Sequence, residues 1–337
     1  MGGKALNKYG VYTQRKTTEE FNRIGFQIKY IVELTLNLNS EVISCYRTKP
    51  DHGDLDLLIE VPSGRNINWR EYISKTFMPI AINANGGVYS FDYDNFQIDF
   101  IPISKSKWNS AVTYFSFDPL GNILGKTYHK FNLSYGWEGL FYKFRNFNGI
   151  NTKNILISND VRKIFEFGGY DYDRYLLGFD TLEEIFDFCI SSKYYNSNVF
   201  QMENLKAIDK KRNRKRGSYH LFLKYIEDNN IIGSNYQFNK NKDVYITEID
   251  KFFPEANLVN TLKKLDAENS QRKIVSQKFN GDVVMMWLPN LMGKELGMVM
   301  SKFKEKINGN YDEFILNSDY NTIREYFMKV YNEEYNK

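Results

Sequence analysis

The chain has 337 residues, of which 42% are hydrophobic and 16% aromatic, and this composition excludes a disordered protein and allows two or three domains. Two cysteines and three scattered histidines exclude a disulfide framework and the usual zinc spacings, so any metal is expected to be held by oxygen. Because neither an apolar leader nor a run of 18 apolar residues is present, we expect a cytoplasmic protein without a membrane partner.

The first predicted element is a helix of about 20 residues. Thr17 and Glu20 have the spacing of a capping box, and apolar residues then recur at helical intervals to residue 35. Strand-like runs follow at 41–47, 54–61, 87–93 and 96–101. A helix followed by several short strands predicts an α+β layer, with the helix lying on the apolar face of the sheet.

Two further regions follow along the chain. The pattern is helical over 104–132, with a turn signal at 118–121, and a second α+β segment extends from a strand at 154–158 to a capping box at 181–184. Beyond about residue 200, strands nearly vanish and helical spacing dominates, which predicts a helical bundle. The predicted domains are therefore 1–105, 106–200 and 201–337.

The strand predicted at 54–61 carries two carboxylates on one face. Side chains alternate along a strand, so Asp54 and Asp56 share a face while the intervening residues are apolar. Like charges at this spacing repel each other, and a divalent cation relieves that repulsion. Asp99, in the strand at 96–101, adds a third carboxylate if the two strands are neighbours. Three such carboxylates suit two Mg²⁺ or Mn²⁺ ions. The alternative is an edge strand with two solvated acids.

A family resemblance rests on these residues. The segment from Ser44 through Gly53-Asp54-Leu55-Asp56, followed by Gln97-Ile98-Asp99, resembles the palm of the polymerase X branch of the polymerase-beta-like nucleotidyltransferase superfamily. The resemblance implies an α+β palm sheet with helices, in which Asp54, Asp56 and Asp99 are the catalytic metal-binding triad and Asp99 is the base. It also implies nucleotide binding by Ser44, Cys45, Arg47 and Gly53.

The resemblance continues into the thumb-like region at 106–200. Tyr114 and Phe115 resemble the pair that flanks the incoming sugar, Asn122 resembles a residue near the base, and Lys126 stands where the family places an arginine near the template. Each has a plain structural alternative: core aromatics for the pair, a helix cap for Asn122 and a surface lysine for Lys126.

Several positions depart from the family pattern. Ser44-Cys45 replaces the Gly-Ser phosphate turn, Thr48 stands for a phosphate-contacting arginine, and Phe117 stands for a glycine. The first 40 residues leave no room for the helix-hairpin-helix domain of many repair polymerases. We therefore do not expect repair of gapped DNA.

The third region carries a strongly basic run. Six of the seven residues at 210–216 are positively charged, and this pattern predicts nucleic-acid binding, with a solvated linker as the alternative. These residues are Lys210, Lys211, Arg212, Arg214, Lys215 and Arg216. Farther on, residues 279–307 resemble the helical tail of tRNA nucleotidyltransferases, although the Arg-Arg-Asp base-reading motif is absent. This second resemblance implies an RNA acceptor such as tRNA.

The combined hypothesis is a metal-dependent nucleotidyltransferase that uses an NTP, such as ATP, and adds a nucleotide to an RNA 3′ end. Three alternatives remain: a polymerase X-like DNA polymerase, transfer onto a protein or small molecule, and a catalytically silent nucleic-acid-binding module. The richness in Asn, Lys, Tyr and Ile is typical of an AT-rich genome, including viral ones.

Overall fold

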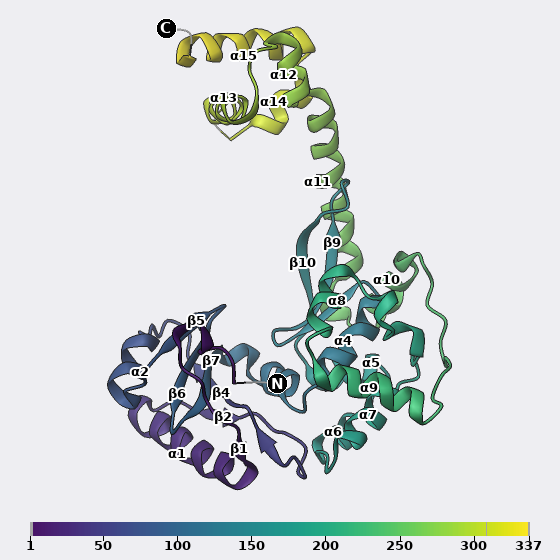
Figure 1. Ribbon diagram of the computed structural model, residues 1–337. Coiled ribbons are helices and arrows are strands. Elements are labelled where there is room, and N and C mark those ends of the chain that lie inside the picture. Colours follow the sequence, from purple (N-terminus) through teal and green to yellow (C-terminus); the bar gives the residue numbers. More distant parts are fainter. Residues whose placement is uncertain (1–2, 308, 336–337) are drawn as a thin grey trace. The chain divides into compact units, whose positions relative to one another are not determined.

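The computed structural model describes residues 3–307 and 309–335, which belong to two compact units (Figure 1). The first unit comprises the chain up to residue 143 together with 154–256, and the second comprises 144–153 and 257–337. The predicted boundaries at 105 and 200 do not coincide with this division. Aromatic side chains beyond residue 200 pack within the first unit: Tyr245 lies 4.8 Å from Phe131 and Phe253 lies 5.3 Å from Phe167, between ring centroids.

The first unit contains a five-stranded sheet with the strand order β2-β4-β7-β6-β5. Its strands are β2 (Ser40–Val42), β4 (Asp54–Val61), β5 (Ile82–Asn85), β6 (Val88–Tyr93) and β7 (Phe96–Ser104). The β4–β7 pair is parallel, while the other neighbouring pairs are antiparallel. A short antiparallel ribbon of β1 (Lys16–Thr17) and β3 (Asp51–His52) accompanies the sheet.

Two helices, α1 (Thr18–Leu36) and α2 (Trp69–Phe77), cover one face of this sheet (Figure 1). The predicted capping box is present, because the Thr17 side chain accepts from the Glu20 N–H while the Glu20 carboxylate accepts from the Thr17 N–H. Buried apolar side chains of both helices pack against those of β4, β6 and β7 that point to this face. The opposite face carries Leu58, Ile101 and Ile103, which pack against α3 (Trp108–Phe115).

The rest of the first unit combines helices with a second, three-stranded sheet of order β10-β9-β8. Its elements are α4 (Leu120–Lys130), β8 (Leu133–Gly136), β9 (Gly139–Arg145), β10 (Asn151–Ser158), α5 (Val161–Phe167), α6 (Tyr172–Leu176), α7 (Leu182–Ile190), α8 (Ala207–Asn213), α9 (Gly217–Asp228) and α10 (Ile246–Phe252). The tip of the β9–β10 hairpin belongs to the second unit.

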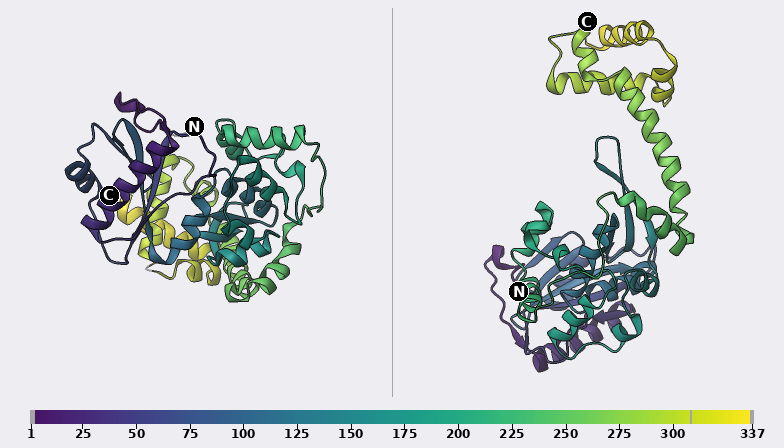
Figure 2. Two further views of the ribbon diagram at one scale, coloured as in Figure 1. Left: turned by 90° about the horizontal axis from the view of Figure 1, so that it is seen from below. Right: turned by 90° about the vertical axis from the view of Figure 1, so that its right-hand side faces the viewer.

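The second unit is helical apart from that hairpin tip. Its helices are α11 (Leu258–Lys278), α12 (Gly281–Trp287), α13 (Gly293–Lys306), α14 (Tyr311–Asn317) and α15 (Tyr320–Tyr335). The four shorter helices gather at the C-terminal end of α11 (Figure 2), around a core that includes Phe279, Phe303 and Phe327. No helix among the described residues is long and apolar enough to cross a membrane.

The predicted α+β class is confirmed, and the strands expected at 54–61, 87–93 and 96–101 are present. The strand expected at 41–47 is present only at 41–42, because β2 ends at Val42. The segment beyond it bonds elsewhere: the N–H groups of Arg47 and Thr48 donate to the carbonyl oxygens of Phe179 and Asp180. Helix α2 and strands β5, β8 and β9 were not predicted.

Candidate active site

The parallel pairing of β4 with β7 brings carboxylates from two strands together. In this register Asp56 lies directly opposite Asp99, and Asp54 lies two residues earlier on the same face of β4. The apolar side chains between them point to the face that α1 and α2 cover. All three residues are partly buried, and they lie on the face that carries Leu58 and Ile101.

Amide donors hold two of the three carboxylates. The Gly3 N–H donates to Asp54 Oδ2 at 3.2 Å, and Gln97 Nε2 donates to both oxygens of Asp99 at 3.0 and 3.2 Å. The orientation of the Gln97 amide is fixed in turn, because its Oε1 accepts from the Ala5 N–H at 2.8 Å. The chain segment at 3–5 therefore lies beside the acidic site.

Burial and mutual repulsion raise the pKa values of two of these groups. Burial, followed by the neighbouring charges of Asp54 and Asp99, raises the pKa of Asp56 well above its usual range. Burial also raises the pKa of Asp99 to about 6, with a further contribution from Asp54. A positive charge at this place would stabilise the ionised forms of both groups.

The donor chemistry of the site fits a hard divalent cation, since three carboxylates offer only oxygen ligands. Within residues 3–307 and 309–335, however, no group of three or more His, Cys, Asp or Glu side chains is arranged to hold a metal ion. Asp54 and Asp99 are turned toward different amide donors, Gly3 and Gln97. Joint coordination of one ion therefore requires these side chains to reorient.

A cavity of about 430 Å³, called the acidic cavity below, opens at Asp54 and Asp56. Four cationic side chains from three segments of the first unit line it as well: Arg15, Lys49, Lys215 and Arg216. A further carboxylate, Asp118, lies there and accepts from Ser218 Oγ at 2.9 Å. The acidic cavity thus combines carboxylates with the positive charges that a phosphate group requires.

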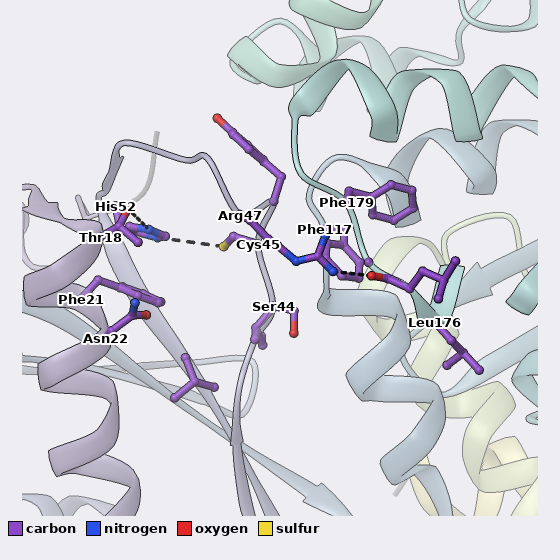
Figure 3. Close-up of a pocket in the computed structure, with 15 residues that line it drawn as sticks. Thr18, Phe21, Asn22, Ser44, Cys45, Arg47, His52, Phe117, Leu176 and Phe179 are labelled. Carbon is purple, nitrogen blue, oxygen red and sulfur yellow. Dashed lines mark hydrogen bonds between the residues drawn. The ribbon is translucent and has the colours of Figure 1, made fainter. Parts of the chain in front are cut away.

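The predicted phosphate turn also lines a second cavity of about 600 Å³ (Figure 3). Ser44 and Cys45 line both. Arg47 lines only the second cavity, and its guanidinium donates to Asp180 Oδ1 at 2.5 Å and to the Leu177 carbonyl oxygen. Arg47 is therefore held away from Asp54 and Asp56.

His52 lies beside the acidic cavity and is shielded from solvent. It is buried, its ring stacks on Phe21 at 3.8 Å, and its Nε2 lies 3.3 Å from Thr18 Oγ1 (Figure 3). Burial lowers the pKa of His52 to about 4, so the ring is neutral at pH 7. Burial likewise raises the pKa of the neighbouring Cys45 thiol, although Lys49 Nζ lies 3.5 Å from its sulfur.

The aromatic pair of α3 lies close to the acidic cavity. Phe115 lines the cavity and also packs against Ile43 and Leu58, so it is both a core residue and a cavity residue. Tyr114 is partly buried, with its ring 5.3 Å from that of Tyr135, and burial raises the pKa of its hydroxyl.

The two residues of α4 that were predicted to contact the nucleotide form side-chain bonds with residues of α8. Asn122 Nδ2 donates to Asn213 Oδ1 at 3.0 Å, and Lys126 Nζ lies 2.9 Å from Asp209 Oδ1. Two structural alternatives are wrong: Lys126 is only 5% exposed, so it is no surface lysine, and the N-cap of α4 is Pro119, so Asn122 is no cap.

The basic run ends α8 and forms the turn into α9. All its charged residues are exposed except Lys210, which is partly buried. Lys215 and Arg216 line the acidic cavity, whereas the earlier members of the run do not. Four residues of the site were not predicted from the sequence: Arg15, Lys49, Gln97 and Asp118. Of these four, only Gln97 could have been found from the sequence. It precedes Asp99 by two residues, and residues two apart in a strand share a face.

Comparisons with known proteins add little to this geometry. No family model matches the chain, and no curated protein matches it. Among solved structures, the chain is similar to two crystal structures of Leishmania infantum polymerase beta. One is a ternary gap complex and the other is a ternary P/T complex. Identity is 13% and 12%, the TM-score is 0.33 in both cases, and the matches cover 39% and 41% of this chain. The chain spans 52% and 61% of those polymerase chains. Similarity at this level does not establish a family, so the site is interpreted from its own residues.

Proposed function

We propose that the chain is a metal-dependent nucleotidyltransferase that transfers a nucleotide from an NTP to a hydroxyl group. The observation that carries this proposal is the parallel register of β4 and β7, which sets Asp56 opposite Asp99 beside a cavity lined by cations. The resemblance of residues 44–59 and 97–99 to the polymerase X palm supports the same chemistry.

In this proposal the three carboxylates bind the metal ions, and one of them is also the base. Asp54, Asp56 and Asp99 hold two Mg²⁺ or Mn²⁺ ions, which when bound neutralise the triphosphate and lower the pKa of the attacking hydroxyl. The hydroxyl oxygen bonds to the α-phosphorus, the bond from that phosphorus to the pyrophosphate oxygen breaks, and Asp99 accepts the hydroxyl proton.

The acceptor that we propose is the 3′ hydroxyl of a nucleic acid, with an RNA end such as that of tRNA placed first. The exposed charges of the basic run support a polyanionic partner. Template-directed DNA synthesis is the second candidate reaction. Asn122 and Lys126, the residues that would contact base and template, already bond to Asn213 and Asp209.

Incorporation assays test this proposal directly. The purified chain is incubated with Mg²⁺ and each labelled NTP or dNTP, against tRNA lacking its terminal residues, single-stranded RNA and primed DNA. Extension of RNA that is lost in Asp54→Ala/Asp56→Ala is the expected result. Template-directed extension of primed DNA would favour the polymerase alternative, and no incorporation on any acceptor would contradict the proposal.

A further inference from the structure

The turn between α8 and α9 brings positive groups into the acidic cavity. Lys215, Arg216, Gly217 and Ser218 line the cavity together with Asp54 and Asp56. Residues more than 150 positions apart in the sequence therefore share one cavity. Its volume of about 430 Å³ is in the range of small-ligand pockets.

The start of α9 adds donors to these charges. The helix has 12 residues, and its N-cap, Arg216, supplies no side-chain acceptor for the first N–H groups. Such groups at a helix N-terminus carry a partial positive charge and bind anions well. The N-terminal turn of α9, at Gly217 and Ser218, lines the acidic cavity.

The two cationic side chains are only loosely engaged. Arg216 lies 3.7 Å from Asp118 Oδ1, which is longer than a hydrogen bond, and Lys215 forms no ion pair within 4.0 Å among the described residues. Arg47, by contrast, is held at 2.5 Å by Asp180. Arg15, which also lines the acidic cavity, pairs with Asp51 at 2.6 Å, so the positive charge available to a ligand beside Asp54 and Asp56 comes from Lys49 and the α8–α9 turn rather than from Arg47.

We propose that this turn binds the triphosphate of the nucleotide substrate, through Lys215, Arg216 and the first turn of α9. A triphosphate brings its own divalent cation, so it can lie between these positive groups and the carboxylates, whereas a bare nucleic-acid phosphate would be repelled by the carboxylates. Lys210 and Lys211 do not line the cavity and remain available to nucleic acid. This inference rests on the proposed nucleotidyl transfer and names the triphosphate subsite of that same site.

Calorimetric binding of inorganic tripolyphosphate with Mg²⁺ to the full chain tests the inference without a base or an acceptor. Lys215→Gln/Arg216→Gln should weaken binding about tenfold or more, because charge-assisted hydrogen bonds to phosphate are lost. Lys210→Gln/Lys211→Gln, the matched control on the same basic run, should change it less than twofold. Thermal melting curves establish that both variants are folded.

Binding of single-stranded RNA to the same proteins should show the opposite pattern, with the larger loss in Lys210→Gln/Lys211→Gln. Equal losses of tripolyphosphate binding in both variants, an unchanged affinity in Lys215→Gln/Arg216→Gln, or no binding by the parent chain would each overturn the inference. Neither measurement requires turnover. A chain that binds tripolyphosphate as expected but incorporates no nucleotide would therefore contradict the proposed function alone.

Discussion

The side-chain amide of Gln97 donates hydrogen bonds to both carboxylate oxygens of Asp99, at 3.0 and 3.2 Å. Its own carbonyl oxygen accepts from the Ala5 N–H at 2.8 Å, which fixes the direction in which the amide points. Gln97 is buried, so its orientation depends on these few partners. The position of the proposed base is therefore set by Gln97 on its own strand, which a segment more than 90 residues earlier orients, and by a side-chain hydrogen bond with Ser90 of β6.

Replacing Gln97 by methionine should weaken metal binding while the fold is kept. Methionine has a similar length but no donor, so Asp99 loses both hydrogen bonds from Gln97 and rotates more freely. Groups that orient metal ligands typically contribute 10- to 100-fold to metal affinity, and we expect about tenfold weaker Mn²⁺ binding by calorimetry. Unchanged Mn²⁺ affinity in Gln97→Met would show that Gln97 does not position Asp99.

Gly3→Ala should disturb the acidic site through the backbone. Gly3 has φ +80, and a Cβ there would lie 2.2 Å from the Gly53 carbonyl oxygen, so the 3–5 segment must move away from Asp54. Gly10→Ala is a matched control, because Gly10 has φ +78 and nothing within 4 Å of the added atom. Both variants should lose about 1 kcal/mol of stability from the backbone penalty. Only Gly3→Ala is expected to lower Mn²⁺ affinity as well, and equal affinities would contradict this.

Local periodicity was enough to predict part of the site. Alternation along 54–61 placed Asp54 and Asp56 on one face, and the structure keeps them there. That β4 and β7 are neighbouring strands was assumed and was not itself predicted from the sequence. Parallel pairing depends on the crossover through α2, β5 and β6, and α2 and β5 were not predicted.

The remaining features depend on contacts between distant segments. Lys126 and Asp209 are 83 residues apart, and no local pattern indicates that α8 covers that face of α4. Arg15, Lys49 and Asp118 likewise enter the acidic cavity from loops whose paths are set by tertiary packing. The three acids and the basic residues Lys215 and Arg216 were therefore named from the sequence, whereas Arg15, Lys49 and the cavity that these residues share were not.

The metal-free protein should lose stability as the pH rises through the titration of Asp99. Burial raises the pKa of this carboxyl from 3.8 to about 6, so the native state binds more protons than the unfolded state between these values. The free energy of unfolding contributed by Asp99 consequently falls as pH rises over that window. Asp99→Asn should be more stable than the parent at pH 7 in EDTA, by on the order of 2 kcal/mol, and nearly equal to it at pH 4. Urea midpoints at the two pH values measure this, and a pH-independent difference would argue against it.

Breaking the Lys126–Asp209 pair should destabilise the first unit. Both side chains are largely buried, and Lys126→Met leaves the Asp209 carboxylate without its cation. Removal of one partner of a buried pair typically costs about 3–5 kcal/mol, whereas replacement of both by apolar residues is often neutral. We therefore expect a lower melting temperature in Lys126→Met and recovery in Lys126→Met/Asp209→Leu. If the double variant also retains full nucleotide incorporation, Lys126 has no direct role in nucleotide binding; a stable but inactive double variant would restore that role.

Nucleic-acid affinity should depend on salt through the basic run. Each phosphate contact with a single strand contributes about 0.7 to the slope of log K against log salt concentration, so Lys210→Gln/Lys211→Gln should reduce the slope by about 1.4. Lys75→Gln is the control, because Lys75 is an exposed lysine of α2 that already pairs with Glu71 at 2.7 Å. Fluorescence anisotropy with a labelled single-stranded RNA at several salt concentrations measures both slopes. If the two variants have the same slope as the parent, the early part of the basic run does not contact phosphate, and the acceptor must bind elsewhere on the chain.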